Sequence, residues 1–77
     1  MVINELKNLF NENGIVKFEL YGLEYTIEKL GDTVIIYPSL YNQRNVSYNS
    51  LEELLNNHLI YNETIIDNQN QISKIYV

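Results

Sequence analysis

The sequence predicts an α+β fold, a two-layer sandwich in which two helices cover one face of a three-stranded antiparallel meander. Three observations lead to it. Residues 16–38 (VKFELYGLEYTIEKLGDTVIIYP) alternate apolar and polar side chains around two glycine-containing turns, as expected of consecutive hairpins. Residues 2–13 and 51–60 place apolar side chains at helical spacing on either side of that segment. The expected order is αβββα, with a further strand over Ile72–Val77, within one domain spanning 1–77.

The two turns set the predicted strand register. Glycine in the first place of a two-residue loop suits a type II′ turn, which we assign to Gly22-Leu23 and to Gly31-Asp32. Counting outward from these turns pairs Phe18 with Ile27 and Ile27 with Ile36. Residues directly opposite share a face, so these three side chains form the predicted core row of the sheet.

The other face of the sheet is expected to be mostly polar and half exposed to solvent. The predicted register brings the opposite charges of Lys17 and Glu28 together on this face. Its other members are Glu19, Tyr21, Glu24, Thr26, Ile35 and Tyr37. Pro38 has no amide hydrogen to donate, so we expect it to end the third strand.

Both helices are expected to pack on the apolar face of the sheet. The first should stop at Asn13-Gly14, because glycine readily adopts the left-handed conformation that follows a helix. The second opens with a capping box, in which Ser50 is the N-cap residue and Glu53 lies three residues further on. Its apolar stripe continues to Leu59 or Ile60.

Two segments have no clear pattern. Residues 39–49 (SLYNQRNVSYN) form a polar loop that is long for so small a chain, so the loop either has a function or contains a short strand. Residues 62–70 are ambiguous, with a turn of helix as one interpretation over Glu63–Asp67. The terminal strand Ile72–Val77 either extends the meander at one edge or pairs with a second subunit.

The charge balance argues against direct binding of nucleic acid or of an anionic membrane. Ten acidic residues against five basic ones give a net charge of −5, and the basic residues are scattered along the chain. Phosphate contacts require clustered Lys and Arg. The order αβββα is shared with double-stranded-RNA-binding domains, but here the last helix begins Leu51-Glu52-Glu53 where such a domain needs basic residues. An acidic surface favours a basic protein partner.

The chain is expected to be cytoplasmic. It contains no cysteine, which fits an intracellular protein and leaves no disulfide or thiolate metal site. No apolar run approaches the roughly 18 residues of a membrane span, and the first residues lack the pattern of a signal peptide. The twelve Asn, ten Ile and absent Ala are what AT-rich coding produces, so we expect a source in an AT-rich bacterium or in its phages and mobile elements.

No constellation of residues predicts catalysis. His58 is the only histidine, and the positions one helical turn away hold Leu54 and Asn62 rather than a carboxylate. General acid–base work needs a positioned partner, so a packing role is expected for this ring. The three glycines form no phosphate-binding loop, and no serine has a nucleophile-elbow context. We expect no enzyme activity, no cofactor and no metal.

Tyrosines and carboxylates on the outer face give the best candidate for a binding surface. Tyrosine is enriched at interfaces because it combines apolar area with a polar tip. The predicted interaction face consists of Glu19, Tyr21, Glu24, Glu28, Ile35, Tyr37, Tyr41 and Tyr48. The alternative is that AT-rich coding has raised the tyrosine content and that these side chains pack locally.

Three functions remain open from the sequence. The first is a non-enzymatic protein-interaction module, in its concrete form a phage or mobile-element accessory or inhibitor protein that binds a basic, nucleic-acid-binding host protein. The second is a homo-oligomeric structural or regulatory protein, a homodimer for example, that pairs through its sheet edge or outer face. The third is an enzyme or small-ligand binder that uses His58 and nearby Tyr61. An unshifted His58 titration and a fold without a cavity would exclude the third.

Overall fold

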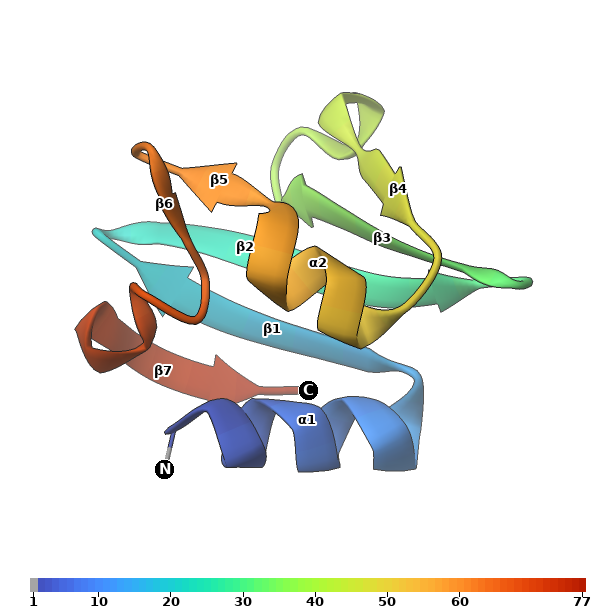
Figure 1. The fold of residues 1–77 in the computed structure, drawn as a ribbon, viewed down its shortest axis with the longest axis horizontal. Helices are drawn as coiled ribbons and strands as arrows, with labels where there is room; N and C mark the ends of the chain where they lie inside the picture. Colours follow the sequence, from blue (N-terminus) through green and yellow to red (C-terminus); the bar gives the residue numbers. More distant parts are fainter. Residues whose placement is uncertain (1) are drawn as a thin grey trace.

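Figure 1 shows the fold in a computed structural model that describes residues 2–77. Two helices pack with an antiparallel sheet of order β4-β3-β2-β1-β7, and a small hairpin, β5-β6, stands apart from that sheet. The α+β class is confirmed. In chain order the elements are α1 (Val2–Asn13), β1 (Ile15–Leu20), β2 (Leu23–Leu30), β3 (Thr33–Pro38), the 3-10 turn η1 (Asn42–Arg44), β4 (Val46–Tyr48), α2 (Leu51–Asn57), β5 (Leu59–Ile60), β6 (Glu63–Thr64), the 3-10 turn η2 (Gln69–Gln71) and β7 (Ile72–Tyr76).

The helices begin and end for local reasons. After α1, Gly14 adopts a φ of +73°, and its amide donates to the carbonyl of Phe10 at 2.7 Å. This is the expected glycine stop. At the start of α2, the Ser50 hydroxyl accepts the amide of Glu53 at 3.1 Å. The helix ends at Asn57, earlier than predicted, because His58 takes an extended backbone conformation that leads into β5.

The register of β2 and β3 is as predicted, with Ile27 opposite Ile36 across the Gly31-Asp32 turn. The predicted register of β1 against β2 is wrong by two residues. The loop between these strands is Tyr21-Gly22 rather than Gly22-Leu23. Its residues have φ of 53° and 80°, and two positive φ values are what a type I′ turn requires.

The corrected register gives Phe18 and Lys17 new partners. Phe18 faces Tyr25 rather than Ile27, and the two rings stack with centroids 5.6 Å apart. Lys17 faces Thr26 rather than Glu28. A displacement by two positions leaves every strand side chain on its predicted face, because side chains alternate with a period of two. Only Tyr21 leaves the sheet face, since it is now a turn residue.

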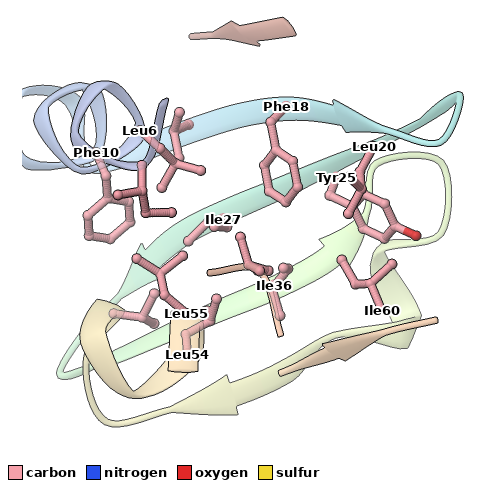
Figure 2. Packing of buried hydrophobic residues seen from close by; sticks show 14 residues of the cluster. Leu6, Phe10, Phe18, Leu20, Tyr25, Ile27, Ile36, Leu54, Leu55 and Ile60 are labelled. Atoms are coloured by element: carbon pink, nitrogen blue, oxygen red, sulfur yellow. The ribbon is translucent and has the colours of Figure 1, made fainter. Parts of the chain in front are cut away.

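The core lies on one side of the sheet, between the strands and both helices (Figure 2). Phe18, Ile27 and Ile36 from the sheet meet Leu6 of α1 and Leu54 of α2, all at most 1% exposed. Ile60 and Ile65 from the segment after α2 complete this layer. Burial of these side chains supplies the main driving force of folding.

The three-stranded sheet of the prediction is extended at both edges. Part of the segment 39–49 forms β4, which pairs with β3 and places Val46 opposite Ile36. The terminal strand β7 pairs with β1 of the same chain, so the first of its two predicted alternatives is correct. Residues Glu63–Asp67, for which a turn of helix was one interpretation, form no helix, although the Asn68 amide closes a single turn onto the carbonyl of Thr64 at 3.0 Å. Strand β6 begins there, after a turn in which Tyr61 and Asn62 both have positive φ.

Candidate functional site

The eight residues of the predicted interaction face do not all lie on one surface of the structure. Five of them share the face of the sheet that looks away from the core: Glu19, Glu24, Glu28, Ile35 and Tyr37. The register adds Lys17, Lys74 and Tyr76 to the same face. We call this set (Lys17, Glu19, Glu24, Glu28, Ile35, Tyr37, Lys74 and Tyr76) the open face, because neither α1 nor α2 packs on it. Ile35 is nevertheless buried, at 7% exposure, as is Thr26 on the same face, at 2%.

The polar groups of the open face hold one another in place. Lys74 Nζ lies 3.3 Å from Glu19 Oε2, and the Tyr76 hydroxyl donates to Glu24. The Tyr37 hydroxyl donates to Glu28 Oε1 at 3.1 Å. Burial, and then this carboxylate, raise the pKa of Tyr37, so its hydroxyl keeps its proton at neutral pH. The face therefore has a fixed pattern of carboxylates and aromatic rings.

A groove of about 350 Å³ lies at one end of the open face. Three large apolar side chains at this groove are exposed: Leu40 by 88%, Leu23 by 48% and Tyr41 by 47%. Glu19 and Glu24 also line it. Its other lining residues are Gly22, Pro38 and Ser39. The groove thus combines apolar side chains with carboxylates.

Backbone hydrogen bonds fix the loop that carries Leu40 and Tyr41. The Tyr41 amide donates to the carbonyl of Pro38 at 2.8 Å, and the Ser39 amide donates to that of Glu24 at 3.0 Å. The guanidinium of Arg44 lies over the Tyr41 ring, 5.1 Å from its centre. Leu40 is therefore presented to solvent by a loop with a defined conformation.

The remaining predicted tyrosines, Tyr21 and Tyr48, lie away from the open face. Tyr21 is in the β1-β2 turn, where its ring packs edge-on against Tyr61 with centroids 5.2 Å apart. Its hydroxyl donates to Asn68 Oδ1 at 3.0 Å. Tyr48, on β4, is half-buried on the core side, and its hydroxyl lies 2.9 Å from His58 Nδ1. Both side chains contact other parts of the chain, although Tyr21 remains 49% exposed.

A second pocket, also of about 350 Å³, lies between the end of β3, η1 and β5. It brings His58 and Tyr61 together, the pair named in the third functional hypothesis. Arg44 lines it as well, and sequence reasoning assigned no role to this residue. The other lining residues are Tyr25, Ile36, Tyr37, Pro38, Leu59 and Ile60. We call it the Arg44 pocket.

Two buried groups of the Arg44 pocket have shifted pKa values. Burial lowers the pKa of His58, so the ring is neutral at pH 7. Burial, and then nearby Tyr61, raise the pKa of Tyr25. No carboxylate lines the pocket. The pocket thus contains hydrogen-bond donors and a neutral imidazole, without the positioned acid that a His-based dyad requires.

Within residues 2–77, no three His, Cys, Asp or Glu side chains gather in an arrangement that could hold a metal ion. None of the described helices is long and apolar enough to cross a membrane. The chain matches no protein-family model, no curated protein and no solved structure.

Proposed function

We propose that this chain is a small acidic module that acts by binding another protein, and that its partner docks in the groove at the end of the open face. One observation supports the proposal above the others: Leu40, at 88% exposure, stands beside Leu23 and Tyr41 in a groove that two carboxylates also line.

Exposed apolar side chains that cluster in one place are characteristic of interaction sites. A single exposed leucine is ordinary, whereas three large side chains around one concave surface give a partner apolar area to cover. Tyr41 adds a rigid ring with few rotatable bonds, the kind of side chain that often dominates binding energy. The loop conformation is set by the Ser39 and Tyr41 amides, so ordering it on binding costs little.

The chemistry of the groove selects a basic partner. Glu24, which within residues 2–77 accepts only the neutral Tyr76 hydroxyl, attracts a Lys or Arg side chain, and Glu19, already paired with Lys74, adds to the acidic wall. An apolar neighbour of that basic residue would cover Leu40. The net charge of −5 adds long-range attraction for a basic protein. A nucleic-acid-binding protein of a bacterial host has such a surface. An accessory or inhibitor protein of a phage or mobile element is the concrete role that we propose.

Acidic residues outside the groove attract a basic partner at long range, and those in the groove contribute to its specific binding. Glu5 and Glu12 lie on α1, and Glu52 and Glu53 lie on α2, away from the groove. These charges act on the approach of a basic partner from any side, and salt screens them. The groove contributes the short-range contacts, so the proposal places specificity in Leu23, Leu40 and Tyr41 and in the two lining carboxylates.

Self-association, the second function expected from the sequence, has less support from the edges of the sheet. Strand β4 spans only Val46–Tyr48, and β7 has a register irregularity opposite Glu19 and Leu20 and carries Lys74. Short edges, bulges and edge lysines are the devices that keep sheets from pairing edge to edge. A measured mass of a dimer at micromolar concentration would reverse this preference.

The proposal is tested by capture of binding partners from lysate of an AT-rich bacterial host, with quantitative mass spectrometry of the captured proteins. The wild-type chain is compared with Leu40→Ser and with the double variant Glu19→Gln/Glu24→Gln. We expect a basic partner whose recovery falls about tenfold or more with Leu40→Ser, the usual effect of removing a central apolar anchor.

Two matched controls make this result specific. Leu30→Ser removes an equally large exposed leucine at the other end of β2, and Glu5→Gln/Glu12→Gln removes two exposed carboxylates from α1. Both controls should retain the partner. Equal recovery by wild type and Leu40→Ser would contradict the groove as the docking site, and recovery of the chain alone would favour self-association.

A further inference from the structure

The Arg44 pocket shares only Pro38 with the groove and is separate from the proposed docking site. It is formed where β5 leaves α2 and passes the end of β3, with η1 closing one side. Its apolar lining comes from Ile36, Pro38, Leu59 and Ile60. Leu59 and Tyr61 are more than half exposed, so apolar surface reaches solvent here.

The polar side chains of this pocket supply hydrogen-bond donors, and among these donors only the Tyr37 hydroxyl has an acceptor within residues 2–77, which is Glu28 Oε1. Arg44 forms no ion pair within residues 2–77; the two ion pairs there are Lys7 with Glu52 and Lys74 with Glu19. Its Cζ atom lies over the Tyr41 ring, 5.1 Å from the ring centre, and a cation–π contact of this kind occupies no N–H donor with an oxygen or nitrogen acceptor. The residue is exposed, so water solvates its N–H groups when no ligand is bound.

Tyr25 adds a second unpartnered donor. The residue is only 8% exposed, yet no hydrogen bond joins its hydroxyl to any of residues 2–77. No side-chain oxygen or nitrogen there is both fully buried and unpaired, so this hydroxyl must reach open space. Tyr25 lines the Arg44 pocket, which provides that space. A bound acceptor at this pocket would take the hydrogen that the hydroxyl otherwise donates to water.

His58 adds a neutral imidazole to the wall of the pocket. Its Nδ1 lies 2.9 Å from the Tyr48 hydroxyl, and its ring is neutral at pH 7. When Nδ1 accepts the hydroxyl proton of Tyr48, the ring's own proton is on Nε2. The pocket then has donors from Arg44, Tyr25, Tyr61 and His58, and no Asp or Glu to satisfy them.

We propose that the Arg44 pocket binds a small monocarboxylate with an apolar, preferably aromatic, body. The planar guanidinium of Arg44 matches the two oxygens of one carboxylate, and the Tyr25 hydroxyl donates to the same group. The apolar body is covered by Leu59, Ile60 and the ring of Tyr61. One arginine balances one negative charge, which favours a monoanion over a phosphate dianion in a chain of net charge −5.

The test is a titration of the 15N-labelled protein with phenylacetate at pH 7, followed by amide chemical shifts. The neutral isostere phenylacetamide is titrated in parallel, and sodium chloride keeps the ionic strength constant. We expect saturable shifts at Arg44 and at His58–Tyr61 with phenylacetate, on the order of millimolar affinity for so small a ligand. Phenylacetamide should bind at least about tenfold more weakly, because it cannot form the charged fork.

Variants separate this pocket from general charge effects. Arg44→Gln should weaken phenylacetate binding about tenfold or more, and Tyr25→Phe, which removes only the hydroxyl, about threefold to tenfold. Lys29→Gln removes one exposed positive charge elsewhere and should leave the affinity within about twofold. The dispersion of each variant's spectrum reports whether it is folded, and Tyr25→Phe remains informative if Arg44→Gln is not.

The proposal would be overturned by equal binding of phenylacetate and phenylacetamide, by equal affinities of Arg44→Gln and Lys29→Gln, or by shifts that do not saturate below about 20 mM. Leu40→Ser should bind phenylacetate like the wild type, because Leu40 does not line this pocket. Leu40→Ser and Tyr25→Phe therefore test the groove and the pocket separately, whereas Arg44 also contacts the groove residue Tyr41.

Discussion

The Tyr21 hydroxyl donates a hydrogen bond of 3.0 Å to Asn68 Oδ1, across 47 residues of sequence. Asn68 is 1% exposed, and its amide group donates to the carbonyls of Ile60 and Glu63 at 3.2 and 3.3 Å. One buried side chain thus joins the β1-β2 turn to both strands of the small hairpin β5-β6. The hairpin in turn forms part of the wall of the Arg44 pocket.

This arrangement predicts that Asn68→Ala strongly destabilises the protein. The substitution removes three hydrogen bonds and leaves the Ile60 and Glu63 carbonyls without their side-chain donor. A buried acceptor that loses its partner costs about 1–3 kcal/mol, so we expect the free energy of unfolding to fall by about 2–4 kcal/mol. Urea denaturation followed by far-UV circular dichroism measures it.

Asn70→Ala is the matched control, because Asn70 is exposed and two residues away from Asn68. It should change the free energy of unfolding by less than about 0.5 kcal/mol. If both substitutions had the same small effect, Asn68 would not join the two hairpins in solution.

The β1-β2 turn supports a second prediction. Gly22 has a φ of +80°, and a Cβ added there would meet no atom within 4 Å. The cost of Gly22→Ala is therefore backbone strain alone, about 1–2 kcal/mol of unfolding free energy. Gly22→Asn should cost less, because Asn tolerates the left-handed region. Thermal unfolding of the three proteins would give the order Gly, Asn, Ala; equal midpoints for Asn and Ala would contradict a left-handed backbone at this position.

The same turn shows how far the sequence could define the register. Apolar alternation identifies which side chains share a face, and it placed Phe18, Ile27 and Ile36 on the core face, although Val16 rather than Phe18 lies opposite Ile27. Alternation has a period of two, so it cannot distinguish a Gly22-Leu23 loop from a Tyr21-Gly22 loop. The choice depends on Tyr21, whose left-handed conformation is supported by contacts with Tyr61 and Asn68, far along the chain.

The parts that sequence reasoning missed are short or assembled from distant residues. Strands β5 and β6 have two residues each, too few for an alternating pattern to be visible. The Arg44 pocket joins four elements, β2, β3, η1 and β5, and no spacing in the sequence connects Arg44 with Tyr25. The one available signal was that Arg44 is the only arginine of the chain. By contrast, Ser50 and Glu53 defined the start of α2 correctly, because a helix cap is a local feature.

The His58–Tyr48 contact predicts a dependence of stability on pH. Burial holds the pKa of His58 in the folded protein below the value near 6.5 that it has in the unfolded chain. Between these two values the unfolded chain binds a proton that the folded protein does not. The free energy of unfolding should therefore stay level as pH falls to about 7 and then decrease as pH falls below about 6.5.

Urea denaturation at pH 7.5 and pH 5.5 measures this loss, and His58→Asn is the comparison, because its side-chain amide does not titrate. The difference between the two pH values should be smaller in His58→Asn, since only the carboxylates then contribute, and they titrate mainly below this range. An NMR titration of the wild-type ring should give a pKa below 6.5. A pKa above 6.5, or an equal pH dependence in both proteins, would mean that His58 is not desolvated beside Tyr48, and the Arg44 pocket would then have a charged imidazole at its wall.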